Sequence, residues 1–312
     1  MNKTHNKSIW RCVDWGSDKA QERFEGGKNR ADPYILNMSM GTNGIYMNDE
    51  KLDLENDDRP CVFRGLGKSP HINKCIEKKI PFMYIDTGYF GNGPRKQWHR
   101  VAYNNLQTLN HRSFDETKKL LVDGLGNAKS KHMINNRFPE IMGCDYKKYK
   151  PTKTSRGAKI LVVPPSQKVF NHFGADAKQY TDNLVEKLKK LTDREIEVRE
   201  KLGRSERVDF TLQDQLSTGQ YHCIVTFNSI ASIESVTVGI PAIVLGPNAG
   251  EFLSETNLKN IENPYLPHAE KIRQHVFYLT LCQFSSEEMQ SILTKRTVEI
   301  LQGDQIPREF KI

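Results

Sequence analysis

Residues 221–246 read YHCIVTFNSIASIESVTVGIPAIVLG, and this stretch decides the fold of its half of the chain. The apolar run that ends at Phe227 predicts a buried strand. Asn228 and Ser229 predict a turn into a helix, and the GIP at 239–241 predicts the end of that helix and the start of another strand. Strand, helix and strand in this order indicate a parallel sheet that is covered by helices.

The alternation of strands and helices extends from this stretch toward the N-terminus. AKILVVPPS at 158–166 predicts a buried strand, and YTDNLVEKLKKL at 180–191 predicts an amphipathic helix. EIEVREK at 195–201 predicts a strand with alternating faces, and TLQDQL at 211–216 predicts a short helix. We therefore expect an α/β fold with a doubly wound parallel sheet, followed by a last helix over 286–301.

The first half of the chain predicts a second α/β unit. PCVFRGLG at 60–67 and PFMYIDTGYFG at 81–91 are apolar runs, and SPHINKCIEKKI between them predicts a helix with Ser69 as its N-cap. Such a βαβ unit makes its two strands parallel. Residues 1–58 are rich in Asn, Gly and Asp, and we expect loops or an irregular cap there.

The length of the chain indicates two domains. Its 312 residues are more than one hydrophobic core usually takes. The basic, turn-rich KKYKPTKTSRG at 147–157 predicts a linker between them. We therefore expect one domain over residues 1–155 and another over 156–312, with the C-terminal helix crossing back over the hinge.

The motif at 221–246 resembles the donor site of the GT-B glycosyltransferases. In that superfamily a strand, a small polar turn, a helix with a glutamate and a G-x-P return form the site. NSIASIESVTVGIPAIVLG at 228–246 is most similar to the bacterial capsule-type transferases, and the likeness covers roughly residues 158–290. It implies a GT-B fold, in which two Rossmann-like doubly wound domains face a cleft. The alternative is an ordinary strand–helix–strand element of another doubly wound protein.

The resemblance also implies how the donor is bound. Residues 156–312 would bind a sugar nucleotide, such as a UDP-sugar or another NDP- or CMP-sugar, and residues 1–155 would bind the acceptor. Ser229 and Ser232 would contact a donor phosphate and Glu234 the ribose. The free N–H groups of a helix start, here beside Asn228, favour anions on physical grounds as well.

Two basic residues at the end of the strand predicted over 195–201 are further candidates for the donor site. Arg199 and Lys201 would lie at the same sheet edge as the motif, where basic groups can neutralise a diphosphate. The alternative is a solvated loop in which these cations pair with Glu200 and Glu206.

Asp86 is the first candidate for the catalytic base. It lies at the end of a predicted buried strand, where the catalytic groups of open α/β folds gather. An inverting sugar transfer needs a carboxylate or a histidine to take the proton of the acceptor hydroxyl. His99 is the second candidate. The alternative for Asp86 is a cap on the turn before Gly88.

Two segments of the first domain have the composition of an anion-binding surface. FRGLGKS at 63–69 combines glycines with cations, and RKQWHR at 95–100 interleaves basic and aromatic side chains, which suits a phosphate backbone and a stacked base. Trp98 suits a core position equally well. The predicted acceptor contacts are the basic and aromatic side chains of these segments: Arg64, Lys68, Arg95, Lys96, Trp98 and Arg100.

The charge of the chain is concentrated in one region. Residues 59–150 hold 18 Lys and Arg against 7 Asp and Glu, whereas residues 151–312 hold 20 of each. A concentrated positive field favours a polyanionic partner. We predict that the acceptor is a hydroxylated base in DNA, which phage GT-B enzymes are known as a class to glucosylate. A polysaccharide or a lipid-linked glycan is the alternative acceptor.

Two other classes of function stay open. A sugar-nucleotide 2-epimerase would share the fold and the donor motif but would need no acceptor surface. A non-catalytic nucleic-acid-binding protein would use the positive charge but would need no donor site.

The cysteine content and the hydropathy of the sequence indicate the cellular compartment in which we expect the protein. Its six cysteines lie far apart, without a CxxC pair or zinc-type His spacing, so we expect reduced thiols, no metal and a cytoplasmic protein, in the host cytoplasm if it is phage-encoded. No apolar stretch is long enough to cross a bilayer, and the first residues have no signal-peptide core.

Overall fold

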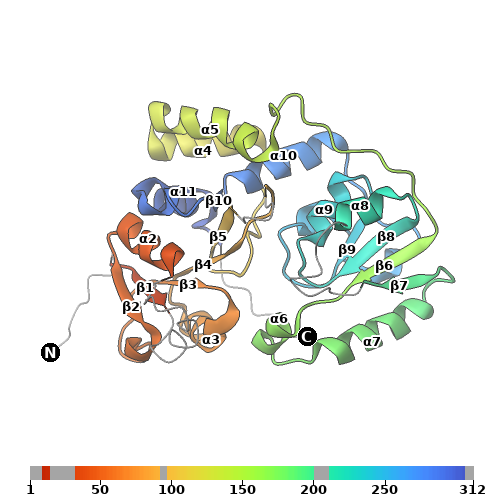
Figure 1. Ribbon diagram of the computed structural model, residues 1–312, viewed down its shortest axis with the longest axis horizontal. Coiled ribbons are helices and arrows are strands. Elements are labelled where there is room, and N and C mark those ends of the chain that lie inside the picture. The colour runs from red at the N-terminus through yellow and green to blue at the C-terminus, as the bar shows by residue number, and fades with distance from the viewer. Residues whose placement is uncertain (1–8, 15–31, 92–96, 200–210, 306–312) are drawn as a thin grey trace, which may run out of the picture. The chain divides into compact units, whose positions relative to one another are not determined.

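A computed structural model describes residues 9–14, 32–91, 97–199 and 211–305, without the side chain of Lys68. The described residues form two compact units (Figure 1). The first contains the chain up to Thr108, Phe114–Gly143 and the described residues from Tyr278 onward. The second contains Leu109–Ser113 and Cys144–Phe277. Of the described helices, none combines the length and the apolar character that crossing a bilayer requires.

A six-stranded mixed sheet forms the centre of the first unit. Its order is β10-β5-β4-β3-β1-β2, in which β2, β1, β3 and β4 run parallel while β5 and β10 are antiparallel to their neighbours. The strands are β1 (Arg11–Asp14), β2 (Ile45–Asn48), β3 (Cys61–Arg64), β4 (Phe82–Thr87), β5 (His99–Tyr103) and β10 (Gln283–Phe284).

Helices cover both faces of this sheet. On one face of the sheet, Ile72 and Cys75 of α3 (Ser69–Lys78) pack with Phe63 of β3 and Phe82 of β4. Successive side chains of a strand point to opposite faces, so every second residue of a strand can join such a core. The helices α2 (Pro33–Thr42) and α11 (Ile292–Gln302) contact the sheet and each other. Figure 1 shows them on the opposite side from α3, with α4 (Phe114–Leu125) and α5 (Asn127–Met142) stacked beyond α11.

The expectation of an irregular cap over residues 1–58 is wrong for the part that the structure describes, because β1, α2 and β2 lie there. The sequence pattern hid β1 because RCVD is only four residues long and all four are buried, so it shows no alternation. The helix α2 begins at a standard signal, since Asp32 caps the N–H of Tyr34 and Pro33 opens the first turn.

The second unit contains a four-stranded sheet of order β7-β6-β8-β9, and all its strands are parallel. On one face α7 (Ala177–Lys189) contributes Leu184 and Leu188 to a core with Ile160 and Val225. The short helices α8 (Leu212–Ser217) and α9 (Ala231–Thr237) lie on the other side of the sheet (Figure 1). The strands are β6 (Lys159–Val163), β7 (Ile196–Val198), β8 (Tyr221–Thr226) and β9 (Ala242–Val244).

Several shorter elements complete the two units. The helix expected over 286–301 is interrupted, because Ser291 has an extended backbone and caps α11, and the turn before it is the 3-10 helix η5 (Glu288–Gln290). The other elements are α6 (Gln167–His172), α10 (Ala269–Thr280), η1 (Asp49–Lys51), η2 (Leu66–Lys68), η3 (Glu251–Leu253) and η4 (Leu258–Asn260).

The parallel strands of both units follow the same plan. In each, the first strand lies between the second and the third, and the fourth lies beyond the third. Ligands of open α/β sheets bind outside the carboxyl ends of the strands, where the order reverses. This plan confirms the expected α/β fold with parallel sheets and directs attention to β1 and β3 in the first unit, and to β6 and β8 in the second.

Candidate functional site

Ionisable side chains gather at the carboxyl edge of the first sheet. Asp14 and Arg64 end β1 and β3, and Asp86 lies near the end of β4. His99 and Arg100 begin the antiparallel strand β5 and pair with Thr87 and Asp86, so they lie at the same edge. We define the carboxyl-edge cluster as these residues together with Asp32, the N-cap of α2, and Tyr34 in the first turn of that helix. Its members are Asp14, Asp32, Tyr34, Arg64, Asp86, His99 and Arg100.

Contacts connect the cluster from β1 to β5. The carboxylate of Asp14 accepts a hydrogen bond from the N–H of Asp32 at 2.8 Å, and Asp32 pairs with Arg64 at 2.5 Å. The Arg64 guanidinium lies over the ring of Tyr34 at 4.2 Å, and the ring centroids of Tyr34 and His99 are 4.0 Å apart. The sheet therefore holds a continuous chain of charged and aromatic groups.

Asp86 and Arg100 form the ion pair at the end of this chain. A nitrogen of the Arg100 guanidinium lies 3.0 Å from Oδ2 of Asp86, and the hydroxyl of Tyr84 donates to the same oxygen at 3.1 Å. Burial opposes ionisation of the carboxyl, but Arg100, the N–H of Thr87, Tyr84 and His99 together lower the pKa of Asp86 below its ordinary value. Asp86 is therefore ionised at neutral pH.

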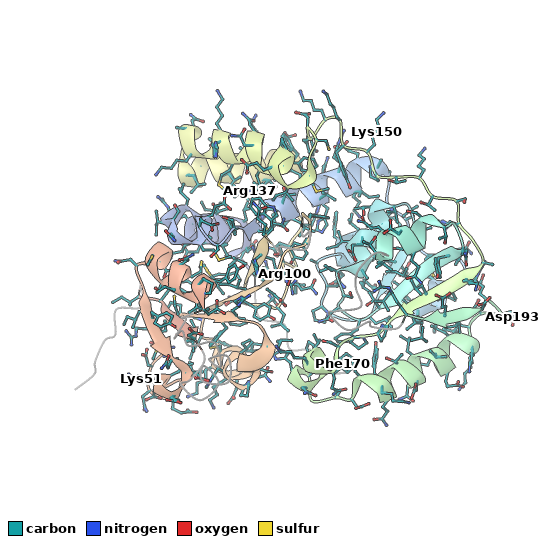
Figure 2. The ribbon with its side chains drawn as sticks, viewed as in Figure 1. Lys51, Arg100, Arg137, Lys150, Phe170 and Asp193 are labelled. Carbon is teal, nitrogen blue, oxygen red and sulfur yellow. The ribbon has the colours of Figure 1, made fainter. Side chains whose placement is uncertain are left out.

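Exposure separates the members of the cluster that a ligand can reach from those that it cannot. The side chain of Asp86 is 39% exposed and that of Arg64 is 31% exposed, whereas Arg100 is 10% exposed. His99 is buried. Arg100 also donates to the carbonyl oxygens of Thr87 and Leu106, inside the unit (Figure 2). Asp86 and Arg64 are thus the two most exposed charged side chains of the cluster.

The segment 95–100 does not present an exposed basic and aromatic surface in its described part. Trp98 is buried, and its ring lies 5.2 Å from the Arg137 guanidinium. Arg100 is buried in its ion pair with Asp86, so neither side chain is free to meet a polyanion. Arg95 and Lys96, which the sequence also assigned to the acceptor, lie outside the described residues, as does the side chain of Lys68.

At the carboxyl edge of the second sheet, Glu234 is the most unusual group. It lies in the first turn of α9, which follows β8, and it is half-buried. Burial raises its pKa, and the nearby Arg199 partly offsets that shift. No described residue donates a hydrogen bond to its carboxylate, whose oxygens are not among the fully buried atoms without a partner, so water can reach them.

Arg199 is held beside this carboxylate by a hydrogen-bonded network. It follows β7, and its N–H bonds to the carbonyl oxygen of Val162 at 2.9 Å. Its Nε donates to the amide oxygen of Gln215 at 3.1 Å, and Gln215 bonds in turn to Glu197 and Tyr221. Arg199 thus lies near enough to Glu234 to influence its charge, although the described contacts include no ion pair between them, and Lys201 lies outside the described residues.

Hydrogen bonds of three side chains, Ser229, Ser232 and Asn248, support the turn after β8. Ser229 accepts a hydrogen bond from the N–H of Ala231 at 3.2 Å and is half-buried, as is Asn228. Ser232 is fully buried, and its hydroxyl donates to the side-chain oxygen of Asn248 at 2.8 Å. Asn248 also donates to the carbonyl oxygen of Ser229 at 2.9 Å. Ser232 therefore contributes to the shape of the turn from inside.

Sequence reasoning missed Asp14, Asp32 and Tyr34 because it treated their region as irregular. Two signals point to them. RCVD ends in an aspartate just as YID does at Asp86, and ADPY places an aspartate before a proline, which is a common helix start.

The Gly-rich turn that the sequence indicates at 63–69 is present in the structure, where Gly65 has a φ of 65°. No described group of three or more His, Cys, Asp or Glu residues is arranged to hold a metal.

A buried histidine, His275, and the half-buried His111 adjoin the loop that supports the turn. His275 donates from Nε2 to the carbonyl oxygen of Ala249 at 2.6 Å, and its Nδ1 lies 3.0 Å from Nδ1 of His111. Burial, and then the charges of His111 and Lys271, lower the pKa of His275 to about 3. His275 is therefore neutral under ordinary conditions.

This shift predicts acid sensitivity. Because the folded pKa of His275 lies below the unfolded value of about 6.5, its contribution to stability is complete above that pH and is lost as the pH falls. We expect the free energy of unfolding to drop by about 2 kcal/mol from this group between pH 6.5 and pH 5. Urea unfolding at both pH values measures the drop. His275→Gln should keep only the part from His172, whose pKa burial lowers to about 4, and from His222, whose pKa burial also lowers. An unchanged drop would contradict the assignment.

Two transferases are among the solved structures to which this chain is similar. No protein-family model matches the chain, and no curated protein matches its sequence. The beta Kdo 2,4 transferase of Thermosulfurimonas dismutans KpsC is similar with a TM-score of 0.41 and 14% identity, over 89% of this chain and 92% of that one. The beta Kdo 2,7 transferase of the same KpsC has a TM-score of 0.46 and 9% identity, over 92% and 99%. With scores this low, the activity of neither neighbour is transferred to this chain.

Proposed function

We propose that this protein is a glycosyltransferase that binds a nucleotide-sugar donor at the carboxyl edge of its second sheet. The observation that carries the proposal is Glu234, a half-buried carboxylate with a raised pKa and no hydrogen-bond donor among the described residues. Ribose hydroxyls would supply the missing donors, and Arg199 beside it suits a diphosphate. Both residues follow strands of a parallel sheet, at the edge where nucleotides bind in such folds.

For the acceptor we propose a hydroxyl of an anionic glycan, bound by the first unit. The two exposed charged groups of the carboxyl-edge cluster have complementary roles: Arg64 would bind an anionic group of the acceptor, and Asp86 would take the proton of its hydroxyl. The DNA base predicted from the sequence depended on the positive charge over residues 59–150 and on the basic and aromatic residues at 95–100. The buried state of Trp98 and Arg100 removes support from it.

The proposed reaction is a direct displacement at the anomeric carbon. The bond between this carbon and the donor phosphate oxygen breaks, the bond to the acceptor oxygen forms, and Asp86 takes the hydroxyl proton. Arg199 and the backbone N–H groups of the turn at Ser229 would stabilise the negative charge on the departing phosphate. Ser232 would act through Asn248 as a positioning residue. Two units with these roles would correspond to the GT-B arrangement.

Glu234→Ala is the direct test of the donor site. A hydrogen bond to a charged group is worth about 1.5–3 kcal/mol, so donor affinity should fall roughly ten- to hundredfold. Calorimetric titration with a panel of UDP-, GDP-, TDP- and CMP-sugars first identifies the donor and then measures the loss. Glu195→Ala is the matched control, since Glu195 is an exposed carboxylate before β7, at the opposite edge of the sheet, paired with Lys159.

If a folded Glu234→Ala protein binds the donor as tightly as the parent does, the Glu234 carboxylate does not contact the donor. If no member of the panel binds, the proposed function fails. Steady conversion of the bound sugar nucleotide without any acceptor would instead identify an epimerase.

A further inference from the structure

Residues 147–156, KKYKPTKTSR, form a segment that the proposed function does not use. We call them the basic segment. They contain five Lys and Arg residues and no acidic one. The segment contains no helix or strand, and it leads into β6 (Figure 1). A stretch with this composition is expected to be a solvated linker, so its backbone contacts decide whether it has a defined shape.

Backbone hydrogen bonds hold the basic segment against other elements of the second unit, to which the segment itself belongs. The N–H of Thr152 donates to the carbonyl oxygen of Thr237, at the end of α9, at 2.9 Å. Gly239 has a φ of 84°, and a Cβ there would lie 2.7 Å from the carbonyl oxygen of Thr152. Just beyond the segment, the N–H of Gly157 bonds to the carbonyl oxygen of Tyr221 at 3.0 Å. The segment thus lies in contact with α9, and the glycine of the GIP motif permits this approach.

The aromatic side chains in and beside the segment face the protein. The ring of Tyr146 meets that of Phe277 at 5.2 Å, edge to face, and lies 5.0 Å from the Arg273 guanidinium. Burial raises the pKa of Tyr149 to about 12. Both rings are half-buried, whereas a surface for single-stranded nucleic acid presents exposed rings on which bases stack.

The cations of the basic segment point outward and stay unpaired. All five are exposed, and none forms an ion pair with another residue of the described ranges; they are Lys147, Lys148, Lys150, Lys153 and Arg156. Figure 2 shows Lys150 at the outer side of the segment. Some exposed lysines of the same unit do pair with acidic neighbours, as Lys178 does with Asp182 at 2.6 Å and Lys189 with Glu186 at 2.8 Å.

From this arrangement we infer that the basic segment docks the protein on the anionic surface of a lipid bilayer. Four of its five cations are lysines, which act as hydrated point charges, whereas specific recognition of single phosphates favours the fork of arginine. Clusters of four to eight such charges bind anionic lipids, reversibly and in a salt-dependent way. Backbone hydrogen bonds at Thr152 and Gly157 hold the segment that carries these charges in place. The inference goes beyond the proposed function and does not depend on it.

Sedimentation with vesicles tests the inference on the full chain. We expect binding at low salt to vesicles of phosphatidylcholine with one third phosphatidylglycerol, little binding to phosphatidylcholine alone, and release as salt is added. Replacing Lys148, Lys150 and Lys153 together with Gln should weaken binding about a hundredfold, since each lysine near such a surface contributes about fivefold. Triple replacement of Lys168, Lys187 and Lys190 with Gln is the matched control, because these lysines are exposed in the same unit and the loss of charge is equal.

Three outcomes would overturn the inference. The first is the absence of binding to the anionic vesicles at low salt. The second is an equal loss in both triple variants, which would make net charge, and not the basic segment, responsible. The third is a duplex DNA that binds more tightly than the vesicles and displaces them, which would assign the segment to nucleic acid. Donor affinity, measured separately by calorimetry, should be the same in all three proteins, so failure here leaves the proposed function intact.

Discussion

Asp86→Asn is expected to lower turnover by about 10²–10⁴-fold while donor affinity persists. The amide keeps the shape of the side chain and can still face Arg100, but it cannot accept the proton of the acceptor hydroxyl. Turnover is measured with the donor that calorimetry identifies and a panel of acidic glycans. Thermal unfolding of the variant shows whether loss of the ion pair has also weakened the fold.

The pH profile separates Asp86 from His99 as the base. Because its neighbours lower the pKa of Asp86, turnover should stay constant through the range in which an ordinary histidine titrates and should fall only in more acidic solution. A fall centred near pH 6–7 would point to a histidine as the base. An Asn variant that keeps more than half of the parent turnover would exclude Asp86 from the chemistry altogether.

Arg11→Met is expected to cost about 3–5 kcal/mol of folding free energy, because it breaks a buried ionic contact. Arg11 is 1% exposed at the start of β1. Its guanidinium donates to the carbonyl oxygens of Asp53 at 3.0 Å and of Arg59, and it lies 3.3 Å from the carboxylate of Asp57. The methionine fills most of the space but leaves these oxygens without a donor. Urea unfolding followed by circular dichroism measures the loss.

Arg59→Met serves as the control for this change. Arg59 pairs with the same carboxylate of Asp57 at 2.7 Å, but its side chain is 19% exposed, so water can replace the contact. Its loss should cost about 1 kcal/mol. Equal costs for the two variants would show that Arg11 contributes through its pairing alone and not through its burial.

The regular part of the fold could be predicted from periodicity. Strands β6 and β8 are mostly apolar runs, and α7 repeats its apolar residues every three or four positions, so both patterns are visible in the sequence. β1 and β10 were missed because their four and two residues are too short for any period. β10 joins the sheet through pairing with His99 and Arg100, a long-range contact that no local pattern contains.

The candidate site was predictable where it follows a visible strand. Asp86, Arg199 and Glu234 lie at sheet edges because each follows a strand or turn that the sequence reveals. The sequence RKQWHR does not show that Trp98 and Arg100 are buried. Alternating basic and aromatic residues occur on protein surfaces, and they also occur in interiors where the basic residue has an acidic partner, as Arg100 has in Asp86. The partner that decides between these cases is distant in sequence, as Arg137 is for Trp98.

The order of the chain has a consequence for synthesis on the ribosome. The first unit needs β10 and α11, from residues 283–302, yet these leave the ribosome after the whole of the second unit. Until then the edge of β5 that pairs with Gln283 and Phe284 lacks its partner strand. The unit that begins first is therefore completed last, and its open strand edge must avoid pairing with other chains during that interval.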